Sequence, residues 1–154
     1  MPKIVNKMLT IRVNEEALLD SLGGRRNIEN KEFNEKLVAA ISEMLKPYKE
    51  AKEWWDDEEP GTTIIVEDYL MPLIYKAIER KDKALLSKFA MWLEDMVSLK
   101  DGVVDSTIYV GVFEKAFFEG KIEDLKPYFL KETNKMYETY PFRKDDAFRP
   151  KQLT

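Results

Sequence analysis

The chain has 154 residues, of which 44% are hydrophobic and 35% are charged, and it contains neither histidine nor cysteine. This length suits one domain with a substantial core, and the composition is ordinary for a soluble globular protein. Zinc sites of the usual His/Cys type, disulfides, thiol nucleophiles and imidazole bases are therefore excluded, whereas carboxylate sites remain possible. No apolar run is long enough for a signal peptide or a transmembrane helix, so we expect a cytoplasmic protein that makes no membrane contact.

Charge is distributed unevenly along the chain. The formal net charge is −4, yet residues 1–31 contain six Lys/Arg against four Asp/Glu, and residues 142–154 contain four against two. The intervening residues 32–141 therefore carry a net charge of −8. An acidic body favours a basic protein partner over nucleic acid, which would favour a basic face. Acidity can also serve solubility alone, and that alternative stays open.

The first predicted elements are short. Residues 8–13, MLTIRV, alternate and include β-branched side chains, which indicates a short strand or an extended arm. Asn14 can cap a short helix, EEALLDSL, that ends at Gly23 and Gly24. Asn30 is the next N-cap candidate, and it opens a helix with one apolar face. The residues of this face are Phe33, Leu37, Ala40, Ile41, Met44 and Leu45.

Prolines interrupt the next two helical segments. Pro47 cannot donate a backbone hydrogen bond, so we expect a kink or a new start there, with the helix continuing to the tryptophans at 54–55. A polar loop, DDEEPGT, then leads to a long helix over about residues 62–80. Pro72 falls within that pattern, so either the first turn of the helix lies near Pro72 or the helix bends there.

Residues 83–120 predict two helices joined by a tight turn at Asp101 or Gly102. Asp82 is placed to cap the first helix, and Gly120 to end the second as a C′ residue. The first helix has one apolar stripe, and the second is apolar around nearly its whole circumference, which is typical of a helix buried on several sides. The pair is predicted to form the centre of the core, with residues 103–119 the most buried. The apolar residues concerned are Leu86, Phe89, Ala90, Leu93 and Val97, then Ile108, Tyr109, Val110, Val112, Phe113, Ala116 and Phe117.

The last predicted helices cover residues 122–129 and 130–140, with Pro127 between them. Residues 142–154 are polar and basic and predict a loosely ordered tail. The sequence thus predicts an all-α fold in which residues 1–141 form one helical domain. Alternating helices and short turns favour an irregular helical bundle or a short α-solenoid of antiparallel helix pairs.

Four carboxylates on the central pair of helices are the candidates for catalysis. Antiparallel packing could bring them together, and paired carboxylates can perform glycosidic acid/base chemistry or bind Mg²⁺. The structural alternative is that Glu94 and Glu114 border the apolar stripes and pair with Lys88 or Lys115. No Gly-rich phosphate loop, Walker lysine or GxSxG elbow is present, so we predict no enzyme, no cofactor and no metal. The four candidates are Glu94, Asp95, Glu114 and Glu119.

The most distinctive local feature places two tryptophans beside four consecutive carboxylates. Tryptophan supplies a large contact area, and carboxylates pair with Lys or Arg, so this segment is predicted to bind a basic protein. Alternatively, one tryptophan closes the core and the carboxylates form a solvated loop. The two can coexist if one tryptophan points inward and the other outward. The predicted partner-binding residues are Trp54, Trp55, Asp56, Asp57, Glu58 and Glu59.

The run from Trp54 to about Tyr140 resembles an uncharacterised family of small all-helical bacterial proteins associated with polymorphic-toxin immunity. The segments that carry the resemblance are WWDDEEP, FAMWLEDM, VFEKAFFEG and LKPYFLKET. The resemblance covers a little over half of the chain and transfers no catalytic residues. It implies a protein that binds and neutralises a cognate toxin. A small enzyme that uses the acidic cluster and a regulatory or scaffold protein with a peptide-binding helical groove are the alternatives.

Overall fold

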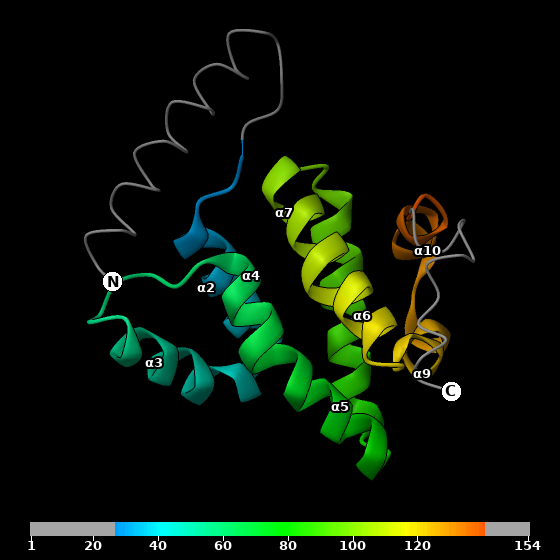
Figure 1. The fold of residues 1–154 in the computed structure, drawn as a ribbon, viewed down its shortest axis with the longest axis horizontal. Helices are drawn as coiled ribbons and strands as arrows, with labels where there is room; N and C mark the ends of the chain where they lie inside the picture. The colour runs from blue at the N-terminus through cyan, green and yellow to red at the C-terminus, as the bar shows by residue number, and fades with distance from the viewer. Residues whose placement is uncertain (1–26, 141–154) are drawn as a thin grey trace, which may run out of the picture.

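A computed structural model describes residues 27–140, and every regular element in this range is helical (Figure 1). The predicted all-α class is therefore confirmed. The strand or arm predicted at residues 8–13, the helix predicted after Asn14 and the tail predicted at 142–154 lie outside the described residues. Buried side chains between Ile28 and Tyr140 form one hydrophobic core.

The first two helices are α2 (Asn30–Ala40) and α3 (Leu45–Trp54), joined by a 3₁₀ turn at Ser42–Met44. The prediction that Asn30 is an N-cap is wrong, because Glu29 occupies that position in an extended conformation and Asn30 is the first helical residue. The break between the helices comes at Ile41, whose backbone is extended. Pro47 lies in the first turn of α3. N–H groups in a first turn have no acceptor within the helix, so the N–H that proline lacks costs no helical hydrogen bond.

The segment at residues 62–80 is one long helix with a change of pitch. It begins as α4 (Thr62–Ile64), widens into the π-helix η2 (Ile65–Leu70) and continues as α5 (Met71–Arg80). Met71 donates its backbone N–H to Val66, five residues earlier, which is the π-helical spacing. Pro72 is the second residue of α5 and directly follows the π-helical segment, whereas the long helix as a whole begins at Thr62. Pro72 therefore lies inside a continuous helix, just after its change of pitch.

The central pair consists of α6 (Lys83–Ser98) and a second helix made of α7 (Gly102–Thr107), the π-helix η3 (Ile108–Glu114) and α8 (Lys115–Phe118). The caps predicted at Asp82 and Gly120 are confirmed, and Asp101 of the predicted turn is also an N-cap. Asp82 accepts a hydrogen bond from the Leu85 backbone (3.1 Å), Asp101 accepts from Val103 (2.8 Å) and Val104 (3.0 Å), and Gly120 has a φ of 70°. These short polar contacts satisfy N–H groups that a helix start leaves unpaired.

α6 lies at the centre of the described fold and contacts α2, α5, α7 and α10 (Lys131–Glu138). The second helix of the pair is buried at Ile108, Val112 and Phe113, but Val110 and Phe118 are exposed. The prediction that this helix is buried almost all round is therefore wrong on that side, because no described element covers it. Isolated exposed apolar side chains of this kind are common on soluble proteins.

The two π-helices cross at a glycine. A Cβ atom at Gly111 of η3 would lie 2.9 Å from Cγ1 of Val66 in η2, closer than non-bonded carbons approach, so any other residue at 111 would force Val66 or the helices to shift. The contact joins the helix of residues 62–80 to the second helix of the central pair.

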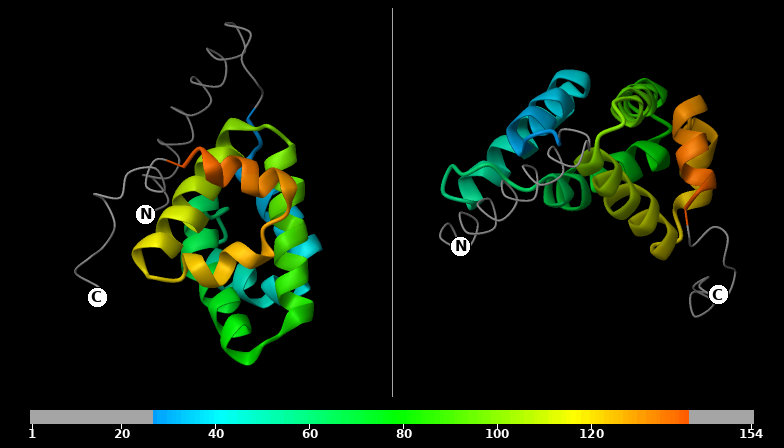
Figure 2. Two further views of the ribbon diagram at one scale, coloured as in Figure 1. Left: turned by 90° about the vertical axis from the view of Figure 1, so that its right-hand side faces the viewer. Right: turned by 90° about the horizontal axis from the view of Figure 1, so that it is seen from above.

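Two short helices complete the described fold, as predicted. α9 (Ile122–Leu125) continues into a 3₁₀ turn at Lys126–Tyr128, which contains Pro127, and α10 follows. Seen from above, the helices form a curved row with α2 and α3 at one end, α9 and α10 at the other, and the central pair between them (Figure 2). Among residues 27–140, the carboxyl end of α3 lies at one extremity of this row (Figure 1).

Candidate functional site

The predicted partner-binding segment lies at the end of α3, and residues 53–59 are called the Trp54 turn below. Its backbone closes in a Schellman arrangement, in which Asp56 donates to the Glu53 carbonyl (3.2 Å) and Asp57 to the Lys52 carbonyl (2.7 Å). Asp56 and Asp57 have φ values of 55° and 65°. This is the left-handed region, which glycine occupies far more readily than other residues. The turn thus has a defined conformation and occurs without glycine.

The Trp54 turn presents an aromatic ring and carboxylates to solvent. Trp54 is 77% exposed, whereas Trp55 is half-buried, so the outward tryptophan is Trp54. Asp56 and Asp57 are exposed and Glu58 is half-buried. None of these three carboxylates forms an ion pair or accepts a hydrogen bond within residues 27–140.

Glu59 is half-buried and makes contacts within the fold, so its role in partner binding stays a prediction. Its carboxylate accepts hydrogen bonds from the Tyr48 hydroxyl and from Nδ2 of the fully buried Asn34 (3.0 Å). Asn34 also donates to the carbonyl of Pro60 (3.0 Å), which is itself buried. Burial, together with the Glu59 carboxylate, raises the pKa of Tyr48, which therefore stays protonated as a donor. Glu59 thus holds the far end of the Trp54 turn against α2 and α3.

Glu94 stabilises another helix. Its two carboxylate oxygens accept hydrogen bonds from the backbone N–H groups of Glu132 (2.8 Å) and Thr133 (3.0 Å), and from the Thr133 hydroxyl (3.1 Å). A negative charge at the N-terminus of α10 is favourable, because unpaired N–H groups and the helix dipole meet there. The predicted alternative, an ion pair of Glu94 with Lys88, is wrong, since Lys88 pairs with Glu43 (3.0 Å).

The other three acidic candidates lie elsewhere. Glu119 pairs with Lys115 (3.2 Å) and accepts a hydrogen bond from Tyr75 (3.1 Å), Glu114 is half-buried, and Asp95 is exposed. Burial is the main cause that raises the pKa of the nearby Glu67. The predicted cluster is not assembled, and residues 27–140 contain no group of three or more carboxylates that could hold a metal ion.

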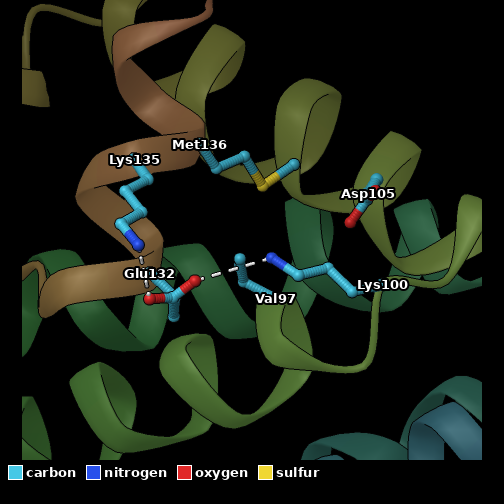
Figure 3. Close-up of a pocket in the computed structure, with 6 residues that line it drawn as sticks. All are labelled: Val97, Lys100, Asp105, Glu132, Lys135 and Met136. Carbon is cyan, nitrogen blue, oxygen red and sulfur yellow. Dashed lines mark ion pairs between the residues drawn. The ribbon is translucent and has the colours of Figure 1, made fainter.

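A pocket of about 230 Å³ opens between the end of α6, the start of α7 and α10 (Figure 3). At its rim Glu132 pairs with Lys135 (3.3 Å) and Lys100 (3.5 Å), which lower the pKa of its carboxyl group. Sequence reasoning missed this pocket, because the spacing of Glu132 and Lys135 predicts only a pair on one helix face. Its two lysines and two carboxylates balance in charge, and its lining includes no side-chain hydroxyl. The lining residues are Val97, Lys100, Asp105, Glu132, Lys135 and Met136.

Comparison of the chain with protein-family models, curated proteins and solved structures gives no match. Among the helices of residues 27–140, none has both the length and the apolar character that crossing a bilayer requires.

Proposed function

We propose that the chain is a non-catalytic protein-binding domain of the immunity type, which neutralises a cognate toxin by covering the toxin's functional surface. The observation that carries the proposal is the Trp54 turn, where a 77% exposed tryptophan stands beside three carboxylates without a partner in the described residues. Exposed aromatic side chains with polar surroundings are typical of the residues that dominate binding energy in protein interfaces.

The energetics of the turn support this proposal. Left-handed backbone at Asp56 and Asp57 costs conformational energy, and carboxylates at the carboxyl end of α3 oppose its dipole. The exposed Trp54 buries little apolar area in return. Features that lower stability and lie together on one part of a surface are typical of functional sites. Selection for stability alone would favour their replacement.

The proposed partner is a basic protein domain. Residues 53–59 contain five carboxylates and no Lys or Arg, and residues 32–141 carry a net charge of −8. Opposite charge steers association, and a toxin that acts on nucleic acid presents a basic cleft that such a surface fits. The acidic side chains Glu94 and Glu119 are engaged in contacts within the fold, which supports binding rather than catalysis.

Trp54→Ala tests the proposed anchor directly. The partner is first recovered by affinity capture with the full chain, and dissociation is then measured by surface plasmon resonance. We expect the substitution to weaken binding by about 2 kcal/mol, mainly through faster dissociation, because a buried aromatic contact is lost. The melting temperature should hardly change, since Trp54 is exposed in the free protein.

Met91→Ala is the matched control, because Met91 is a large apolar side chain that is 61% exposed on α6. It should leave the dissociation rate unchanged. Equal dissociation rates for wild type and Trp54→Ala would show that Trp54 does not contribute to the interface, and would refute the proposal.

A further inference from the structure

The Trp54 turn combines two kinds of group that have no partner within the described residues. Trp54 is the most exposed of the large hydrophobic side chains between residues 27 and 140, so the faces of its indole are open. The Schellman closure brings the backbone of Asp57 back to Lys52, so Asp56 and Asp57 follow Trp54 in one compact turn. The turn therefore offers an exposed aromatic side chain and exposed carboxylates from neighbouring residues.

Within residues 27–140, no cation fills this position. Lys52 precedes the turn on α3, but its ammonium group lies over the ring of Tyr48, 5.6 Å from the ring centroid. Lys88 and Lys115 pair with Glu43 and Glu119. The described residues thus leave the negative charge of the Trp54 turn uncompensated.

The unpaired carboxylates restrict what can cover Trp54. An apolar partner surface would take Asp56 and Asp57 out of water without supplying hydrogen-bond donors, and burying a charge without a partner is costly. Nucleic acid and anionic lipid surfaces would meet the same carboxylates with like charge. A cationic side chain is the occupant that satisfies both the ring and the carboxylates.

We infer that the Trp54 turn recognises an arginine side chain of the partner, with the guanidinium stacked on the Trp54 indole and hydrogen-bonded to Asp56, Asp57 or Glu58. The guanidinium is planar, so it stacks on a ring while its N–H groups at the edge reach a carboxylate. A lysine ammonium is a strongly hydrated point charge without a planar face, so it is expected to fit this combination less well. This inference rests on the proposed function and specifies the chemistry of the partner.

Two labelled, glycine-spaced peptides of equal length and charge test the inference, one bearing arginine and the other lysine. Their affinities for the full chain are measured by fluorescence anisotropy at low salt. Wild type should bind the arginine peptide about two- to fivefold more tightly. Trp54→Leu keeps an apolar side chain but removes the aromatic face, so it should abolish the difference. Asp56→Asn combined with Asp57→Asn should weaken both peptides, and asparagine tolerates the left-handed backbone of the turn.

The exposed carboxylates Asp95 and Asp124 provide the matched control, because their replacement by asparagine removes the same charge from other elements. This control should leave the preference for arginine intact. Equal affinities for the two peptides, or a preference that persists in Trp54→Leu, would overturn the arginine inference. If the arginine inference fails in this way but the affinity of both peptides still falls in the Asp56→Asn, Asp57→Asn variant, the proposed binding surface is retained without the preference for arginine. Failure of both peptides to bind would overturn the inference and the acidic binding surface together.

Discussion

Replacing Phe113 with alanine should lower the free energy of unfolding by about 3–5 kcal/mol, the largest single effect that we expect for this chain. Phe113 is fully buried in η3 and lies at the centre of an aromatic cluster. Its ring centroid is 5.2 Å from that of Tyr137, 5.5 Å from Phe129 and 5.9 Å from Tyr109. The substitution would leave a cavity where the second helix of the central pair meets α10. Urea denaturation followed by circular dichroism measures the effect.

Val110→Ala is the control for this prediction, because Val110 lies in the same π-helix but is 37% exposed. Its cost should be below about 1 kcal/mol, since partly exposed side chains leave little cavity. If Phe113→Ala unfolds at the same urea concentration as wild type, the central position of this helix in the core is refuted.

Glu94→Gln should lower the free energy of unfolding by about 2–3 kcal/mol, although glutamine has nearly the same shape. The two Glu94 oxygens accept from the backbone N–H groups of Glu132 and Thr133. Glutamine offers one oxygen and would turn an amide N–H₂ toward one of these donors, so a donor at the start of α10 loses its partner. The removed negative charge also no longer favours the helix N-terminus. Hydrogen exchange should show faster opening of α10 in particular.

Glu114→Gln provides the comparison, because Glu114 is half-buried on η3 and its side chain makes no capping hydrogen bond. We expect a change of about 0.5 kcal/mol or less, as is usual for substitutions away from specific contacts. Equal stability of Glu94→Gln and Glu114→Gln would contradict the structural role of Glu94.

Local chemistry explains the parts of the fold that the sequence predicted well. Asp82 and Asp101 accept hydrogen bonds from N–H groups two or three residues later, and Gly120 supplies a positive φ at its own position. Such contacts involve residues close together in the chain, so they can be predicted from the sequence alone. Pro72 is a further example of a local signal. Because proline has no N–H to donate, the helix must start or become irregular near it, whatever the helix packs against.

Contacts between distant residues explain what the sequence did not predict. Glu94 binds residues 38 and 39 positions later, and Glu59 binds Asn34, 25 positions earlier. Helical spacing shows which face of α6 carries Glu94 but not which helix end lies beside that face. The acidic residues therefore looked alike in sequence, although Glu59 and Glu94 make structural contacts and Asp56 and Asp57 have no partner among residues 27–140.

The choice between Trp54 and Trp55 was undecided in sequence for a geometric reason. Adjacent helical residues point about 100° apart, and where α3 ends decides which side chain leaves the core. The Schellman closure at Asp56 and Asp57 ends the helix so that Trp54 is outward. Two successive left-handed aspartates are not a pattern from which this ending could be predicted, since glycine is the usual residue there.

The central claim is that the Trp54 turn binds a basic protein, and the most direct test is the salt dependence of the association rate. The triple variant Asp56→Asn, Asp57→Asn, Glu58→Gln is compared with wild type against the recovered partner. A control replaces the exposed carboxylates Glu79, Asp95 and Asp124 by their amides. We predict that the triple variant associates about tenfold more slowly at low salt, that the difference shrinks as salt rises, and that the control stays close to wild type. Equal association rates for wild type and the triple variant at low salt would contradict the claim and make the segment a solvated loop.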